Sequence, residues 1–248
     1  MANFEEIWKE PPASIQLSAD EIHLWRVDLG SNAIGNSPKE CLLSDDEIAR
    51  AKKFHFSRDK DSFVRARAAL KCILARYVPY LPNRIRFFYK PNGKPELLAT
   101  QNNIGLNFNL SHSGDFAIIG VTLGRRIGVD VERYRTLEFL EIARRYFSSS
   151  ESRQLTALPP NELQNNFFAC WTRKEAFLKA LGEGIGVLLP HVSVTVAQFE
   201  SPKLIEFQGN ADASLRWSLA DTQVSDGYAA ALAFENGPVT IRNYIFAE

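Results

Sequence analysis

The stretch Ile127-Gly128-Val129-Asp130-Val131-Glu132 ends a β-rich middle of the chain and indicates the fold class. Apolar and acidic residues alternate in it with a period of two, as they do in a strand that is buried on one face only. Asp130 and Glu132 therefore share the opposite face of this strand. Earlier strand-like runs, separated by Gly, Asn and Pro residues, occupy 85–89, 105–110 and 116–123.

Helical patterns flank these strands on both sides. The sequence Ser44-Asp45-Asp46-Glu47 is a capping box that opens a helix. Further helices are predicted at 59–77, 137–147, after Ser148, and at 161–181, where Gly182 ends the helix. Further strands are predicted at 22–29, 192–196, 204–207, 215–219, 228–234 and 239–244, with a loop at 30–38. This order predicts an α+β fold built from two similar halves, residues 1–124 and 125–248.

A faint internal repeat supports the two halves. Residues 65–71, RARAALK, have the same frame as residues 173–179, RKEAFLK. Each run lies downstream of a Phe-Ser pair, Phe56-Ser57 or Phe147-Ser148. The repeat is weak support for a duplication, because helices share residue types by chance.

Composition excludes several classes of protein. The 248 residues are 45% hydrophobic and 23% charged, with 29 basic and 29 acidic residues, so the net charge is zero. A chain without a basic field is not expected to bind nucleic acid in bulk. It has no run of about 18 apolar residues for a membrane span and no signal-peptide pattern. Three scattered cysteines without C-x-x-C spacing, Cys41, Cys72 and Cys170, favour a cytoplasmic location.

The two carboxylates of the Asp130–Glu132 pair have two interpretations. A half-buried strand whose acidic side faces water explains them without any function. Carboxylates that share one face are also the ligands that Mg²⁺ takes together with substrate phosphates. On its own, the pair favours the first interpretation.

A second candidate lies in residues 171–179, WTRKEAFLK. Glu175 and Lys179 are four residues apart, so they lie on the same side of a helix. An ordinary surface ion pair explains them. Alternatively, Glu175 faces a cation while Lys174 and Lys179 bind anionic oxygens, as a pyrophosphate site requires.

A third candidate is residues 108–114, FNLSHSG, in which Ser111 and His112 are adjacent. Neighbours in an extended chain point to opposite sides, which argues against a serine-to-histidine proton relay. Both side chains can instead donate hydrogen bonds to a phosphate. A turn histidine with local hydrogen bonds explains the motif equally well.

Basic residues of the N-terminal half form a fourth candidate. The turn at 90–95, KPNGKP, presents Lys94, and the first helix carries Arg50, Lys52 and Lys53. Exposed basic residues are usually only solvated surface. The phosphate-binding loop, dinucleotide-binding, zinc-protease and α/β-hydrolase motifs do not occur in the chain.

Taken together, these motifs resemble the signature of the 4′-phosphopantetheinyl transferases, specifically the long, surfactin-synthetase-activating type. The motifs that carry the resemblance are Gly93-Lys94-Pro95, Phe108 to Ser113, Ile127 to Glu132, and Trp171 to Ala176 with Lys179. The resemblance implies a monomer of two pseudo-two-fold halves with coenzyme A at their junction. Such enzymes transfer the phosphopantetheine arm of coenzyme A to a serine of an apo acyl or peptidyl carrier protein and release 3′,5′-ADP. No nucleic acid or membrane partner is implied.

The resemblance also implies roles in the C-terminal half. Asp130, Glu132 and Glu175 would hold Mg²⁺, or Mn²⁺, against the pyrophosphate. Glu175 or a bound water would take the serine proton, and Lys174 and Lys179 would steady the phosphates.

In the N-terminal half, Ser111 and His112 would hold the 3′-phosphate, with Lys94 and Arg50 as further phosphate contacts. Some relatives have a lysine where this chain has Glu47, one turn before Arg50. The basic residues of the first helix are therefore interchangeable candidates.

Two further positions follow from the resemblance. Glu151 matches an acidic position near the family's active site, although Ser148 to Glu151 is also a capping box. The carrier would dock on a basic and apolar segment formed by Arg133, Arg135, Arg144, Arg145, Leu137, Phe139 and Leu140.

Two rival functions stay open from the sequence. One is a non-catalytic module that binds coenzyme A or phosphate. The other is a different Mg²⁺-dependent phosphotransferase that acts on a nucleotide.

Overall fold

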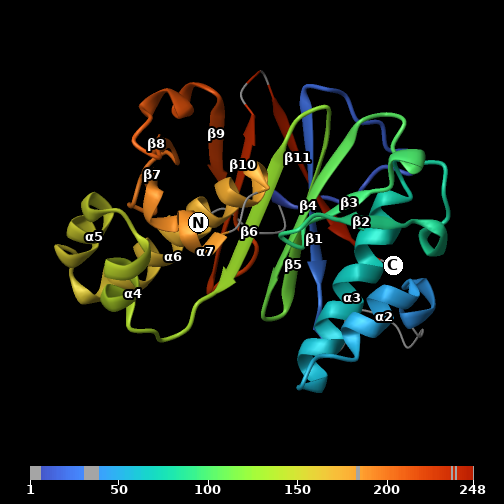
Figure 1. The fold of residues 1–248 in the computed structure, drawn as a ribbon, viewed down its shortest axis with the longest axis horizontal. Helices are drawn as coiled ribbons and strands as arrows, with labels where there is room; N and C mark the ends of the chain where they lie inside the picture. Colours follow the sequence, from blue (N-terminus) through green and yellow to red (C-terminus); the bar gives the residue numbers. More distant parts are fainter. Residues whose placement is uncertain (1–6, 31–38, 183–184, 236, 238, 248) are drawn as a thin grey trace. The chain divides into compact units, whose positions relative to one another are not determined.

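Figure 1 shows the helices and strands of the computed structural model, which describes residues 7–30, 39–182, 185–235, 237 and 239–247. The loop expected at 30–38 lies outside the described residues except for Gly30. The chain divides into two units, residues 1–124 with 240–248, and residues 125–239. The last strand therefore belongs to the first unit, whereas the sequence assigned it to the half 125–248.

A four-stranded sheet with the order β11-β1-β5-β4 forms the centre of the first unit. Its strands are β1 (Glu21–Asp28), β4 (Leu106–Ser113), β5 (Phe116–Leu123) and β11 (Thr240–Phe246), and the hairpin β2 (Phe87–Tyr89) and β3 (Pro95–Leu97) is separate. β11 pairs with β1 in parallel, from Glu21 opposite Thr240 to Val27 opposite Phe246. This pairing explains why the C-terminal strand belongs to the first unit.

Helix α3 packs its apolar side against that sheet. The helical elements of the unit are η1 (Lys39–Leu42), α2 (Asp45–Ala51), α3 (Ser57–Leu74), η2 (Pro82–Arg84) and η3 (Ala99–Gln101). Ala66, Leu70 and Ile73 share one buried cluster with Trp25 and Ile119 of the sheet. Their spacing of three and four residues puts them on one helix face, as the sequence predicts. Full burial of one such Leu or Ile contributes roughly 2 kcal/mol.

The second unit places a long helix against a three-stranded sheet with the order β6-β10-β9. Its strands are β6 (Ile127–Arg133), β7 (Val192–Val194), β8 (Leu204–Phe207), β9 (Trp217–Asp221) and β10 (Tyr228–Glu235). Its helices are α4 (Phe139–Tyr146), α5 (Ser149–Thr156), α6 (Pro160–Leu181) and α7 (Ile185–Leu188), with η4 (Leu189–His191) and η5 (Ala211–Leu215). Gly182 adopts a left-handed conformation with φ 74° and ends α6, as predicted.

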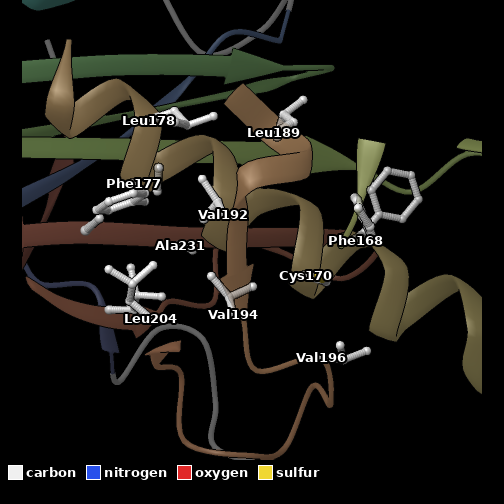
Figure 2. Close-up of a cluster of buried hydrophobic side chains, with 14 of the residues drawn as sticks. Phe168, Cys170, Phe177, Leu178, Leu189, Val192, Val194, Val196, Leu204 and Ala231 are labelled. Atoms are coloured by element: carbon white, nitrogen blue, oxygen red, sulfur yellow. The ribbon is translucent and has the colours of Figure 1, made fainter. Parts of the chain in front are cut away.

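Figure 2 shows the core of this unit, to which α6 contributes Phe168, Cys170, Phe177 and Leu178. Valines of β7 and Ala231 of β10 complete the same cluster. Because α6 is buried over most of its length, its polar residues are held in fixed positions.

The structure confirms the expected α+β class and most of the predicted elements. One difference affects the candidate site: β4 continues through Ser113, where the sequence suggested a turn. Hydrogen-bonded pairing with β5 carries this strand further, to Ser113 opposite Phe116. None of the described helices is long and apolar enough to cross a membrane.

Candidate active site

Gly128 allows α6 to approach β6 closely. A Cβ atom at Gly128 would lie 2.0 Å from the Ala176 carbonyl oxygen and 2.3 Å from the Ala180 nitrogen. No larger residue fits there without moving the helix backbone. Because Gly128, Asp130 and Glu132 alternate onto one face of the strand, this approach brings Glu175 and Lys179 to the acidic face of β6. Gly128 was not among the residues predicted to be functional, although a glycine inside a strand is a known sign of close backbone approach.

Three carboxylates and one lysine meet at this place. The Lys179 ammonium donates to Asp130 Oδ1 at 2.5 Å, and Arg135 donates to Glu132 Oε2 at 2.7 Å. Burial, followed by the negative charges of Asp130 and Glu132, raises the pKa of Glu175 to about 7, while Lys179 opposes the shift. Burial disfavours the charge of Lys179, yet Asp130 and Glu175 raise its pKa. Three acidic side chains therefore lie with two cations, Lys179 and Arg135, and the raised pKa leaves Glu175 partly protonated near pH 7.

The carboxylate oxygens of Asp130, Glu132 and Glu175 are of the kind that bind a hard divalent cation. Carboxylate oxygens are the ligands that Mg²⁺ takes in proteins. After burial, the negative charges of Asp130 and Glu132 contribute to the raised pKa of Glu175, and a cation would offset both effects. Within the described ranges, no three His, Cys, Asp or Glu side chains are already gathered as metal ligands. Asp130, Glu132 and Glu175 are the carboxylates whose chemistry could hold such a cation.

Lys174, which the sequence assigned to phosphate binding, has its ammonium group enclosed by other residues of the fold. Its fully buried ammonium donates to Glu151 Oε2 and to the Val192 carbonyl, both at 2.5 Å. Glu151 also accepts from the Ser148 amide as part of a capping box and from the Val194 amide. Consecutive residues on a helix point in different directions, so Lys174 is turned away from the side that carries Glu175. Lys174 and Glu151 join α5, α6 and β7 to one another.

The predicted basic residues of the first unit lie on separate elements. Arg50 is exposed in the last turn of α2, with its guanidinium carbon 5.6 Å from the centre of the Phe63 ring. Lys94 belongs to the tight turn between β2 and β3, where Gly93 has φ 82° and the Lys90 amide donates to the Lys94 carbonyl at 3.0 Å. The turn thus presents Lys94 from a fixed backbone, as expected.

Ser111 and His112 lie on β4, the last strand in its sheet. Ser111 is buried and His112 is exposed, and in a strand they alternate to opposite faces. A phosphate that contacts both therefore has to approach the edge of the sheet.

Comparison with known proteins places these features in one family. Residues 126–233 match the 4′-phosphopantetheinyl transferase superfamily, and residues 39–123 match the N-terminal region of 4′-phosphopantetheinyl transferases. The chain is 36% identical over 230 residues to the 4′-phosphopantetheinyl transferase HetI of Nostoc sp., covering 92% of this chain and 94% of HetI. The chain belongs to the 4′-phosphopantetheinyl transferase superfamily and has the two-domain organisation of its long type, which confirms the resemblance and the enzyme class.

More distant relatives share shorter regions. The 4′-phosphopantetheinyl transferase Sfp of Bacillus subtilis is 28% identical over 157 residues, which is 63% of this chain and 68% of Sfp. A crystal structure of a holo-(acyl-carrier-protein) synthase from Bacillus anthracis, in complex with coenzyme A, is 23% identical. It covers 44% of this chain and 93% of its own, with a TM-score of 0.36.

Proposed function

We propose that the protein transfers the phosphopantetheine arm of coenzyme A to a serine of an apo carrier protein in a Mg²⁺-dependent reaction. The serine oxygen would form a bond to the phosphorus that bears pantetheine. The pyrophosphate bond would break, and 3′,5′-ADP would leave. The observation that carries the proposal is the cluster of Asp130, Glu132 and Glu175 around Lys179, in a chain of this family. We further propose that the protein acts as a monomer.

Asp130, Glu132 and Glu175 would hold the cation, which supplies positive charge against the pyrophosphate. Lys179 would contribute a second positive charge from the same face, where Asp130 fixes its ammonium and 20% of the side chain is exposed. Phosphoryl transfer depends mainly on such positioning and charge neutralisation. Lys174 takes no phosphate contact in this proposal, because Glu151 and the Val192 carbonyl enclose its ammonium.

We assign the proton transfer to Glu175. A general base works best when its pKa lies near the operating pH, and burial together with neighbouring carboxylates raises the pKa of Glu175 to about 7. Glu175 would accept the proton of the serine hydroxyl as the oxygen attacks phosphorus. A water molecule held by the same carboxylates is the alternative base.

The first unit would hold the 3′-phosphate through Ser111 and His112, with Arg50 and Lys94 as further contacts. Each of these is a hydrogen-bond donor, and imidazolium, ammonium and guanidinium groups are charged donors.

The proposed docking surface for the carrier includes α4. Arg144 and Arg145 are exposed there, whereas Phe139 and Leu140 are half-buried beside them. An acidic amphipathic helix of a carrier protein complements such a surface. Arg144→Glu should raise the KM for the carrier and leave the KM for coenzyme A unchanged.

Intact-protein mass spectrometry tests the reaction directly. An apo acyl carrier protein is incubated with the protein, coenzyme A and Mg²⁺, and a parallel sample contains EDTA. We expect the carrier to gain one phosphopantetheine mass and the gain to disappear with EDTA. Asp130→Asn and Glu132→Gln should each slow transfer about a thousandfold, since several kcal/mol of charge stabilisation are lost. The matched control is Glu206→Gln, an exposed carboxylate on β8.

The rival functions give different results in this assay. Coenzyme A binding without transfer to fatty-acid, polyketide or peptidyl carriers would indicate a non-catalytic module. Release of a product other than 3′,5′-ADP would indicate another phosphotransferase.

A further inference from the structure

Arg67 of α3 is a buried guanidinium held by aromatic rings. Only 6% of the residue is exposed, and its guanidinium carbon lies 5.5 Å from the Phe63 ring centre, 5.8 Å from Phe87 and 5.7 Å from Tyr89. Within the described part of the chain, its Nε and one terminal nitrogen, Nη1, have no hydrogen-bond acceptor. Buried polar groups are nearly always hydrogen-bonded, so this arrangement calls for an explanation.

The charges around Arg67 do not balance. One turn further along α3, the Lys71 ammonium lies 2.6 Å from Glu47 Oε2, and both side chains are fully buried. Glu47 is thus already matched by one lysine, and Arg67 adds a second positive charge. Burial lowers the pKa of Arg67, while Tyr89 and Glu47 raise it and the nearby Arg50 lowers it, and a guanidinium stays charged at neutral pH. The cluster therefore has an excess positive charge.

The second unit contains the same arrangement without an unpaired guanidinium, because buried Arg173, next to Lys174, forms an ion pair with Asp221. Glu151 and Lys174 form a buried pair like that of Glu47 and Lys71, and each glutamate belongs to a capping box. The residue four positions before Lys174 is the neutral Cys170, whereas Arg67 occupies that place before Lys71. A buried pair of this kind therefore forms without a guanidinium four residues before its lysine, so Arg67 has another role.

Arg67 shares ring contacts with Arg50 and with the hairpin that carries Lys94, the two further residues proposed to contact phosphate in this unit. Its ring partner Phe63 also contacts Arg50, at 5.6 Å. Its other partners, Phe87 and Tyr89, form β2 of the hairpin whose turn carries Lys94. Cation–π contacts of desolvated groups are stronger than those at exposed sites, so the contacts of buried Arg67 help to fix these elements.

We propose that Arg67 is a positioning residue for the phosphate site of the first unit: it fixes Arg50 and the Lys94 hairpin and adds a buried positive charge beneath them. This inference rests on the proposed function, because that function supplies the 3′-phosphate as ligand. Arg67 itself does not touch the reacting atoms.

Calorimetric binding of 3′,5′-ADP and 5′-AMP tests the inference without any need for turnover. The wild-type protein should prefer 3′,5′-ADP. Arg67→Met should weaken 3′,5′-ADP binding about tenfold and 5′-AMP binding less than threefold. Arg67→Lys should restore part of the affinity, because it keeps the charge but loses the planar group that stacks on the rings. Arg76→Met is the matched control, since exposed Arg76 also lies over a ring, that of Trp25.

The outcomes separate this inference from the proposed function. If Arg67→Met keeps the wild-type preference, or weakens both ligands equally in a normally folded protein, the positioning role is wrong. A wild-type protein without preference for 3′,5′-ADP overturns it as well. If the wild type binds with the expected preference but transfers nothing, only the proposed function fails. Circular dichroism checks the fold. If Arg67→Met does not fold, Arg67→Lys and Arg67→Gln are compared instead, and the positioning role requires Arg67→Lys to bind 3′,5′-ADP more tightly than Arg67→Gln.

Discussion

The two units each bury a lysine against the glutamate of a capping box, and they differ in the charge that lies beside this pair. In the first unit the pair is Glu47 and Lys71, and in the second it is Glu151 and Lys174. The residue that follows the lysine is Cys72 in the first unit and Glu175 in the second. The same structural pair thus stands next to an additional cation, Arg67, in one unit and an additional anion in the other.

This difference separates the residues that hold the fold from those that serve the site. A buried ion pair whose charges cancel can anchor a helix, whereas an uncompensated buried charge is costly and is kept where a ligand can match it. The positive excess suits phosphates and the negative excess suits a cation. The proposed reaction between a metal-bound pyrophosphate and a carrier serine would use both.

Removing one partner of a buried pair should have the largest effect on stability. Lys174→Met should lower the free energy of unfolding by about 3–5 kcal/mol, because the buried Glu151 carboxylate loses its counter-charge. Lys71→Met should cost less, because the positive charge of Arg67 remains near Glu47. Denaturant unfolding measures this change. Combining each with Glu47→Gln or Glu151→Gln should recover most of the loss.

The two buried pairs are not equivalent if Lys174→Met is as stable as the wild type but binds coenzyme A weakly. That result would return Lys174 to the phosphate role that the sequence analysis gave it.

Closing the gap between β6 and α6 should come next. Gly128→Ala places a methyl group against the Ala176 and Ala180 backbone and should cost about 3 kcal/mol in the free energy of unfolding. Transfer should fall as well, since Glu175 and Lys179 move away from Asp130. Gly186→Ala is the control, because a Cβ atom there meets nothing within 4 Å. Equal midpoints for the two variants in denaturant unfolding would contradict the close approach.

Neutralising Glu175 should stabilise the metal-free protein while it stops transfer. The folded state holds the Glu175 proton up to a pKa of about 7, above the ordinary 4.5, so the carboxyl group costs stability as pH rises from 4.5 through 7. Glu175→Gln removes this cost and should add about 1–3 kcal/mol at pH 8 but little at pH 5. Unfolding midpoints in EDTA at both pH values measure the gain. A gain that does not depend on pH would show that Glu175 is not charged at an energetic cost.

The fold followed from the sequence because most elements carry local signals. The capping boxes at Ser44 and Ser148 and the left-handed Gly182 set helix ends, and they lie where they were predicted. The parallel pairing of β11 with β1 was missed, because the partners are more than 200 residues apart and no local pattern encodes their pairing.

The site was only partly predictable, for a related reason. The face shared by Asp130 and Glu132 follows from the two-residue period of a strand. The sequence repeat aligned Lys71 with Lys179. In the structure, Lys71 instead has the environment of Lys174, because each of these lysines forms a buried ion pair with a glutamate. Several helical frames fit such a short match equally well, and only the buried partners Glu47 and Glu151 distinguish them.

The smallest expected effect tests whether the two capping boxes are equivalent. The Ser44 hydroxyl donates to Glu47 Oε2 at 2.8 Å, and the Ser148 hydroxyl accepts from the Glu151 amide at 3.3 Å. Ser44→Ala and Ser148→Ala each remove one hydrogen bond at a glutamate that also binds a buried lysine, so each should cost about 1 kcal/mol. Exposed Ser149→Ala should change stability by less than about 0.5 kcal/mol. If thermal or denaturant unfolding gave a cost several times larger for one box than for the other, the pairs would share their geometry but not their contribution to the fold.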